Sequence, residues 1–285
     1  MKPKVIIIGV GYTGRLAIAR SVGQLGYRSV IITAADFSVG GKRLKHVKPV
    51  DGYSKYVDEI FYVPRKDEAK IIEVLLTHCV VPGQKQIIFP DGDFDAMVLD
   101  KNYDILKEHF LMPNIKGQSG LVSKYMDKLV QKSVARQVGL NVAGSSTMEV
   151  RDEQFVVPDS VRYPCFVKAQ MGLAGGKRLL KRCDSREQVE QHLRAMIRRM
   201  KDIHVSTDIT VLIEDFMRID KEYALLGFSD GKEVFIPGLL YIDLLCHGLQ
   251  MGVAVRGKIM PCHGFEDVVE KFKQMMLEIG RASCR

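Results

Sequence analysis

The N-terminal part of the chain alternates between an unbroken apolar run and an amphipathic stretch. Val5–Ile8 is a continuous β-branched run, which is typical of a strand buried on both faces of a parallel sheet. A glycine-rich segment follows at residues 9–14, and a helix is predicted after it. The apolar positions of this helix recur at helical spacing before the stop at Gly26, and they are Leu16, Ile18, Val22 and Leu25. Residues 29–33 predict a second strand, which completes a β-α-β unit.

The same alternation continues to about residue 115. Asp67 can cap a helix with apolar positions at Ile71, Ile72, Leu75 and Leu76. Gln86–Pro90 predicts another short buried strand, which ends at the acidic residues 91–93. Strands that alternate with helices in this way predict a doubly wound, Rossmann-like α/β domain.

The second half of the chain has a different pattern. Residues 120–139 predict a linker helix that stops at Gly139, with Leu121, Leu129, Val130 and Val134 on one side. After it, strands are expected close together at residues 164–170, 178–182, 209–216 and 222–228, with a capped helix from Asp184. Residues 229–232 read Ser-Asp-Gly-Lys, which is typical of a hairpin turn. This half is therefore predicted to be α+β, with antiparallel sheet.

Composition places the chain among globular proteins. It has 285 residues, of which 46% are hydrophobic and 27% charged, and this excludes a disordered chain and a small disulfide scaffold. At about 150 residues per domain, the length predicts roughly two domains. No apolar run approaches the roughly 18 residues of a spanning helix, and residues 1–4 lead directly into a strand. Neither a membrane partner nor export is expected.

Charge and cysteine usage narrow the expected partners and location. Lys and Arg outnumber Asp and Glu by 42 to 34, for a formal charge of +8. The densest basic segment, residues 194–201, forms the solvated side of an amphipathic helix and has no interleaved aromatic residues, so no nucleic-acid partner is predicted. The six cysteines are scattered singly, with neither a C-x-x-C pair nor zinc spacing. Reduced thiols and a cytoplasmic location are expected.

The first candidate site is a G-x-G-x-x-G pattern formed by Gly9, Gly11 and Gly14, with Asp36 just beyond the second strand. In a dinucleotide site such glycines let a pyrophosphate approach the helix N-terminus, and the acid binds the ribose hydroxyls. The same turn also packs a helix on a strand in domains that bind no nicotinamide. A cofactor site and a structural turn are both open at this point.

The second candidate is a lysine at the end of an apolar strand, Lys168, followed by a glycine-rich loop. The loop contains Gly172, Gly175, Gly176 and Lys177. A flexible basic loop of this kind suits a lid that closes over polyphosphate. It is not a Walker A loop, because it is one residue short and Arg178 stands where Ser or Thr would hold magnesium. A hairpin with solvated lysines is the alternative.

The third candidate is the apolar strand at residues 211–217, which presents Glu214 near its end and is followed by Glu222. Such a strand can hydrogen-bond an adenine edge through its backbone and a carboxylate, while the next acid holds a ribose. Surface strands also often end in acids, so an ordinary surface strand is the alternative.

The order of these signals, preceded by Asp127 and Lys128 at the linker helix, resembles the ATP-grasp superfamily. The likeness is to carboxylate–amine ligases, including the D-aspartate ligase and carbamoyl-phosphate-synthase-like groups. Residues 54–64, 87–93 and 139–142 support it, and it covers nearly the whole chain. It implies a Rossmann-like domain over residues 1–118, a linker helix and lid over 119–210, and a partial catalytic subdomain over 211–277.

The resemblance also implies roles for individual residues. Lys128 and Lys168 would contact the ATP phosphates, under a lid formed by Gly172, Gly175, Gly176 and Lys177. Glu214 and Met217 would bind adenine, Glu222 the ribose, and Arg256 would be a catalytic, anion-stabilising residue. The implied chemistry transfers the γ-phosphate of ATP to a carboxylate, and an amine attacks the resulting acyl phosphate. ATP and Mg²⁺ are the implied cofactors, a small carboxylate and an amine the substrates, and a homodimer is compatible with the family.

The chain departs from the family pattern at its C-terminal end. Family members continue into a Glu-x-Asn-x-Arg segment that holds magnesium, but no Glu-x-Asn follows the helix expected at residues 268–277. Residues 278–285 resemble a translated sequencing adaptor, so we expect a non-native tail on a truncated frame that lacks the magnesium ligands. An NAD(P)-binding oxidoreductase that uses Gly9, Gly11, Gly14 and Asp36, and a non-catalytic nucleotide-binding protein, remain the alternatives.

Overall fold

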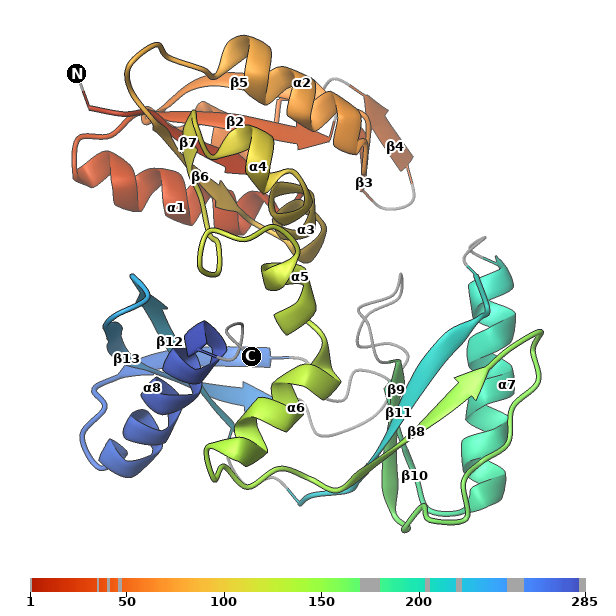
Figure 1. The fold of residues 1–285 in the computed structure, drawn as a ribbon. Helices are drawn as coiled ribbons and strands as arrows, with labels where there is room; N and C mark the ends of the chain where they lie inside the picture. Colours follow the sequence, from red (N-terminus) through yellow and green to blue (C-terminus); the bar gives the residue numbers. More distant parts are fainter. Residues whose placement is uncertain are drawn as a thin grey trace. The chain divides into compact units, whose positions relative to one another are not determined.

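The computed structural model describes residues 2–34, 36–39, 42–45, 48–169, 180–202, 206–218, 222–244 and 254–281. The chain divides into two compact units, Met1–Tyr125 and Met126–Arg285 (Figure 1). Each unit has its own buried core. The finer division expected from the sequence, with limits at residues 118 and 210, remains a proposal about subdomains.

The first unit is built on a parallel sheet of five strands. Its order is β5 (Val57–Val63), β2 (Ser29–Ala34), β1 (Val5–Ile8), β6 (Gln86–Pro90) and β7 (Phe110–Leu111). Ile6 of the central strand β1 lies opposite both Val30 of β2 and Ile88 of β6. The strand order reverses at β1, which is the arrangement of a doubly wound sheet.

Helices cover both faces of this sheet, because successive side chains of β1 point to opposite faces. Val5 and Ile7 pack with Ala19 of α1 (Tyr12–Gln24). Ile6 and Ile8 face the larger core, which is closed by α2 (Glu68–His78), α3 (Asp93–Lys101) and α4 (Tyr103–Leu106). The unbroken β-branched run is therefore buried on both faces, as the sequence predicts.

The segment between β2 and β5 contains elements that the hydrophobic pattern did not predict. β3 (Asp36–Val39) and β4 (Lys42–Lys45) pair as an antiparallel ribbon. A short 3-10 turn, η1 (Val50–Tyr53), precedes β5. Asp36, the expected ribose-binding acid of a dinucleotide site, thus begins the ribbon strand β3.

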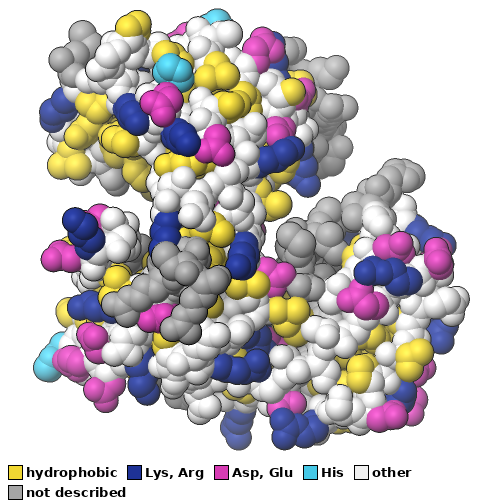
Figure 2. All heavy atoms as spheres, in the orientation of Figure 1, with side chains coloured by type: hydrophobic (Ala, Val, Ile, Leu, Met, Phe, Trp, Pro, Cys, Tyr) yellow, Lys and Arg dark blue, Asp and Glu magenta, His cyan; other side chains and the backbone are white. Residues whose placement is uncertain are grey.

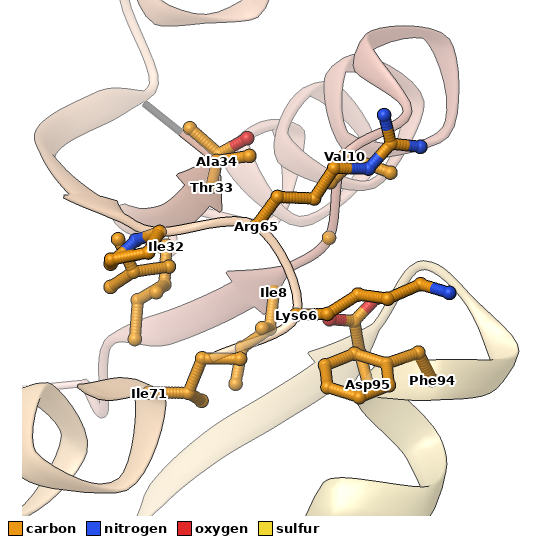
Figure 3. Close-up of a pocket in the computed structure, with 13 residues that line it drawn as sticks. Ile8, Val10, Ile32, Thr33, Ala34, Arg65, Lys66, Ile71, Phe94 and Asp95 are labelled. Atoms are coloured by element: carbon orange, nitrogen blue, oxygen red, sulfur yellow. The ribbon is translucent and has the colours of Figure 1, made fainter. Parts of the chain in front are cut away.

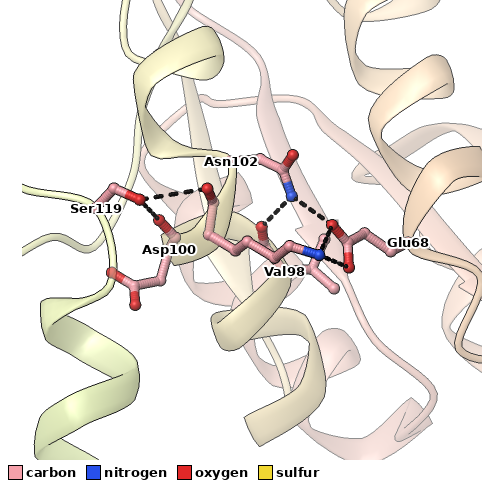
Figure 4. A network of polar contacts seen from close by, with 6 residues as sticks. Glu68, Val98, Asp100, Asn102 and Ser119 are labelled. Carbon is pink, nitrogen blue, oxygen red and sulfur yellow. Dashed lines mark hydrogen bonds and ion pairs between the residues drawn. The ribbon is translucent and has the colours of Figure 1, made fainter.

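A polar network holds α2, α3 and α5 (Leu121–Tyr125) together within the first unit (Figure 4). Glu68 of α2 accepts a hydrogen bond from the Asn102 side chain at 3.0 Å. The Ser119 hydroxyl donates to the carbonyl of Asp100 at 3.0 Å, and the buried Asp100 carboxylate accepts from the backbone N–H of Ser123 at 2.8 Å. Asp100 therefore satisfies unpaired N–H groups at the start of α5 and attaches this helix to α3.

The second unit begins with α6 (Lys128–Gln137) and an antiparallel sheet of four strands. The strand order is β10 (Lys181–Cys183), β9 (Cys165–Ala169), β11 (Ile209–Asp215) and β8 (Ser145–Val150). One face packs on α7 (Arg186–Asp202), whose buried side chains are Val189, Leu193, Met196, Ile197 and Met200. The basic residues of α7 are its solvated side, as predicted. The limit expected at residue 210 falls inside β11.

A second antiparallel sheet follows in the same unit. It consists of β12 (Glu222–Ser229), β13 (Val234–Leu244) and β14 (Ala254–Met260), and it contacts α8 (Glu266–Arg281). The predicted hairpin turn joins β12 to β13, where Asp230 Oδ1 accepts from the backbone N–H groups of Lys232 and Glu233, both at 2.9 Å. The α+β character expected for this half of the chain is confirmed.

Two helix predictions were wrong in extent. The helix expected over residues 120–139 is interrupted between α5 and α6, because Asp127 caps α6 by accepting from the backbone N–H of Leu129 at 2.7 Å. The helix expected at residues 268–277 continues to Arg281. It therefore includes the first residues of the segment 278–285 that the sequence analysis set apart as a tail.

In the part of the chain that the structure describes, no helix has both the length and the apolar character needed to cross a bilayer. On the face shown in Figure 2, basic and acidic side chains are interspersed over both units. The excess of positive charge therefore does not gather into one basic patch among the described residues of that face.

Candidate functional site

β9 and β11 place Lys168 and Glu214 on the same face of the four-stranded sheet. Lys168 lies opposite Leu212 in the antiparallel register, so Glu214, two residues further along β11, shares its face. The other face carries Val167 and Ile213, which belong to the core under α7. Strand alternation thus turns the two charged side chains away from that core.

The Glu214 carboxylate is held between two ammonium groups. Lys132 of α6 pairs with Glu214 Oε1 at 2.6 Å, and Lys168 pairs with Oε2. The three side chains are only 11–22% exposed. Burial raises the pKa of Glu214, but hydrogen bonds from Lys132 and Lys168 outweigh it, so the pKa lies below its ordinary value. The cluster therefore combines one carboxylate with two lysine side chains, which gives it an excess of positive charge.

Lys132 is a residue that the sequence analysis missed. The sequence feature that could have identified it is its spacing of four residues from Lys128, because residues four apart lie on one side of a helix. Lys128 itself occupies the first position of α6, next to the capping Asp127. Lys128 thus lies in the first turn of α6 and Lys132 one turn further along the helix. The structure places Lys132 with Lys168 and Glu214.

Of the remaining expected site residues, the structure describes Met217, Glu222 and Arg256. Met217, 57% exposed, follows the end of β11, and Glu222 begins β12 half-buried. Gly172, Gly175, Gly176 and Lys177 lie outside the described residues, in the connection from β9 to β10. Arg256 of β14 lies across from Asp243 of β13, and its Nε is 2.9 Å from Asp243 Oδ2.

The glycine turn of the first unit contains a carboxylate of the protein itself. A Cβ atom added at Gly9 would lie 2.7 Å from Asp91 Cβ, and one added at Gly11 would lie 2.9 Å from Asp91 Oδ2. One added at Gly14 would overlap Asp91 Oδ1. Asp91 follows β6 and therefore lies at the N-terminus of α1, where a dinucleotide pyrophosphate would bind. The turn is a close packing of β1, α1 and Asp91, which favours its structural interpretation.

A buried ion pair lies beside the glycine turn. Arg15 Nε is 2.6 Å from Asp51 Oδ2, and both side chains are almost fully buried. Arg15 also donates to Thr33 Oγ1 at 2.7 Å and to the carbonyl of Gly9. The pKa of Asp91 is raised by burial, which the positive charge of Arg15 partly opposes. Arg15 therefore connects α1, η1 and the ends of β1 and β2.

A pocket opens at the carboxyl ends of β1, β2 and β5 (Figure 3). Arg65 and Lys66 extend along it from the loop after β5, and Phe94 and Asp95 come from α3. Burial, with the nearby charge of Asp91, raises the pKa of Asp95 to about 6. Asp95 is the acidic residue that lines this pocket.

The structural interpretation of the turn predicts the effect of Gly9→Ala. Gly9 has φ +157°, and an added Cβ would meet Asp91 Cβ at 2.7 Å. We expect the substitution to lower the free energy of unfolding by about 1–3 kcal/mol, measured by urea denaturation, because both strain and overpacking oppose it. Val10→Ala, at a neighbouring side chain that is 58% exposed, is the matched control with little change. Equal stability of the two variants would contradict the packing described.

Comparisons with known proteins show which proteins this chain resembles in sequence and in fold. No protein-family model matches the chain. The formate-dependent phosphoribosylglycinamide formyltransferase of Bacteroides thetaiotaomicron is 23% identical over 228 residues, which make up 76% of this chain and 53% of the relative. The chain therefore spans about half the length of this curated relative.

Two solved structures match nearly the whole chain. An L-amino acid ligase from Bacillus licheniformis superposes with a TM-score of 0.64 at 14% identity, over 98% of this chain and 60% of that one. The biotin carboxylase domain of the Hydrogenobacter thermophilus 2-oxoglutarate carboxylase, a dimer solved with MgADP, ADP and bicarbonate, superposes with a TM-score of 0.65. It is 16% identical and covers 97% of this chain and 58% of that one. The chain shares its fold with these two proteins.

The ATP-grasp resemblance and the mixed α/β fold class expected from the sequence are thereby confirmed. In this chain the glycine turn belongs to the first unit, and the cluster of Lys132, Lys168 and Glu214 belongs to the second. Asp91 in the glycine turn argues against a dinucleotide site at that turn.

Proposed function

We propose that this ATP-grasp chain binds ATP in its second unit and serves an ATP-dependent ligation of a carboxylate to an amine. The observation that carries the proposal is the cluster in which Lys132 and Lys168 flank Glu214. Its positive charge, partly shielded from solvent, suits the phosphates of a nucleotide. The neighbour solved with MgADP supports ATP as the cofactor.

The proposed reaction has two steps. A carboxylate oxygen attacks the γ-phosphorus of ATP, the bond to the bridging oxygen breaks, and ADP leaves. The amine then attacks the carbonyl carbon of the acyl phosphate, an amide bond forms, phosphate leaves and the amine nitrogen loses a proton. Phosphoryl transfer of this kind depends on positioning and charge neutralisation rather than on a protein nucleophile. Lys128 and Lys168 would supply positive charge at the phosphates.

The other proposed roles follow the family resemblance. Glu214 and the exposed Met217 would bind adenine, Glu222 the ribose, and the residues of the β9–β10 connection, including Gly172, Gly175, Gly176 and Lys177, would cover the phosphates. Arg256 would stabilise the developing anion, for which it would have to leave its pair with Asp243. This exchange is open to Arg256, because its side chain is 71% exposed.

Magnesium is the proposed companion of ATP. Within the described ranges, no three or more His, Cys, Asp or Glu side chains gather into a group that could hold a metal ion. Mg²⁺ is usually bound through one or two carboxylates together with the phosphates of the nucleotide, so it would enter with ATP. The positive charge that the described cluster offers to a nucleotide comes from Lys132 and Lys168.

The proposed partners are a small-molecule carboxylate and an amine. A homodimer is proposed from the neighbour that was solved as a dimer. A cytoplasmic location is proposed from the cysteines, since Cys79, Cys165, Cys183 and Cys262 are free thiols in the described part of the chain.

Nucleotide binding is the first expectation to test. At about 100 times its Kd, ADP should raise the free energy of unfolding by about 2.7 kcal/mol, which corresponds to a rise in Tm of about 5–10 °C for a unit of this size. The measurement is a thermal-shift titration with ADP and ATP, with and without magnesium, supported by calorimetry.

NADH and NADPH are the controls for this titration. The proposal predicts no shift with either nicotinamide, because Asp91 lies where their pyrophosphate would bind. A shift with NADH or NADPH and none with ADP or ATP would overturn the proposed function and move the working site to Gly9, Gly11 and Gly14.

A further inference from the structure

The two oxygens of Glu214 have different lysine partners from different parts of the fold. Oε1 pairs with Lys132 of α6, 82 residues earlier in the chain, and Oε2 pairs with Lys168 of the neighbouring strand β9. The Lys132 side chain is 11% exposed and that of Lys168 is 22% exposed. The more accessible lysine is therefore the one that could turn toward a ligand.

The Lys168 ammonium group cannot pair fully with a nucleotide phosphate and with the Glu214 carboxylate at the same time. A lysine has one ammonium group, and a carboxylate left without a partner in a part-buried site is costly. If Lys168 were the sole partner of Glu214, moving it to a phosphate would leave an uncompensated anion beside the anionic nucleotide. Lys132 removes this conflict, because it keeps Glu214 paired when Lys168 moves.

The charge count leads to the same conclusion. Lys168 and Glu214 alone would form a neutral pair with little attraction for a polyphosphate. With Lys132 the cluster carries one net positive charge. Among the residues that the structure describes, Lys132 and Lys168 are the side chains whose hydrogen bonds lower the pKa of Glu214, and both pair directly with its carboxylate.

We propose that Lys132 is a positioning residue of the nucleotide site, which holds Glu214 through Oε1 and so releases Lys168 for the nucleotide phosphates. The inference rests on the proposed function, since it concerns how the same site binds nucleotide. Lys132 acts through Glu214 and does not itself contact the phosphates. Its importance therefore depends on the charge of Glu214.

The test is a double-mutant cycle on ADP affinity, measured by isothermal titration calorimetry. Lys132→Met is expected to weaken ADP binding by roughly tenfold or more, because Lys168 then stays with Glu214. In the Glu214→Gln background, which has no carboxylate to hold, Lys132→Met should cause no further loss. Lys132→Arg, which can still pair with a carboxylate, should retain most of the wild-type affinity for ADP.

Arg136→Met is the matched control, because it removes a positive charge from an exposed position one turn further along α6. It should leave the Kd for ADP unchanged. An equal loss from Lys132→Met in the wild-type and Glu214→Gln backgrounds would show a direct phosphate contact and overturn the inference. So would an unchanged Kd in Lys132→Met.

Failure of the proposed function gives a different result. In that case the wild-type chain itself would not bind ADP, and the inference would fall with the proposal. Thermal unfolding of each variant without ligand shows whether it is folded. If Lys132→Met does not fold, Lys132→Gln takes its place in the cycle, with the same expected losses.

Discussion

Replacement of Arg15 by methionine is expected to lower the free energy of unfolding of the first unit by about 3–5 kcal/mol. Arg15 is 1% exposed and Asp51 is 0% exposed, so the substitution leaves a fully buried carboxylate without its counter-charge. The hydrogen bonds from the guanidinium to Thr33 and to the carbonyl of Gly9 would be lost as well. Hydrogen exchange of peptides from the first unit, followed in increasing urea, would measure the loss.

The matched control is Arg20→Met, at an exposed position of the same helix. It should change stability by less than about 0.5 kcal/mol. The double variant Arg15→Met with Asp51→Leu should recover much of the loss, because an apolar pair leaves no unpaired charge. A loss no larger for Arg15→Met than for Arg20→Met would show that the buried pair does not hold this unit together.

Replacement of Lys168 by alanine is expected to weaken ADP binding by about 1.5–3 kcal/mol, or roughly tenfold to 150-fold in Kd, through loss of a charge-assisted phosphate contact. The same substitution should change stability much less than Arg15→Met, because Glu214 keeps its 2.6 Å pair with Lys132. Calorimetric titration of the folded variant measures the affinity.

Lys181→Met provides the comparison for this substitution. Lys181 lies on β10, opposite Val167 of β9, and its side chain is exposed. Its loss removes one positive charge from the neighbouring strand without touching the Glu214 cluster. If Lys168→Ala and Lys181→Met bind ADP equally well, then Lys168 does not contact the nucleotide.

Local patterns predicted several of the regular elements correctly. The β-branched run Val5–Ile8 has enough apolar character to be buried on both faces wherever it pairs. The Ser-Asp-Gly-Lys turn carries its own hydrogen-bond acceptor in Asp230, so the hairpin needs no distant partner. These elements were predictable because the interactions that specify them lie within a few residues.

Competition between local signals explains where the prediction of helices failed. The apolar spacing over residues 120–139 is helical, yet Asp127 offers its side chain to the backbone N–H of Leu129 and starts a new helix. The ribbon of β3 and β4 has no alternating pattern, since Lys42, Arg43 and Lys45 crowd one strand. Hydrophobic periodicity contains no information about either feature.

The sequence by itself determined which residues of this chain could perform chemistry. Lys168, Glu214 and the glycine turn stand out because their residue types and neighbours are unusual, and their order along the chain resembles the ATP-grasp superfamily. Sequence spacing also determined that Lys168 and Glu214 lie at strand positions, although it left open whether the glycine turn binds a cofactor.

Only the tertiary structure decided which of these residues meet. Glu214 lies 82 residues from Lys132, and Asp51 lies 36 residues from Arg15. Asp91 reaches the glycine turn only because β6 pairs with β1. Such contacts are set by strand pairing and by helix packing on the sheets, and no pattern within one segment specifies them. The sequence therefore determined the candidates. The packing of distant segments decided that Asp91 occupies the glycine turn and that Glu214 pairs with both Lys132 and Lys168.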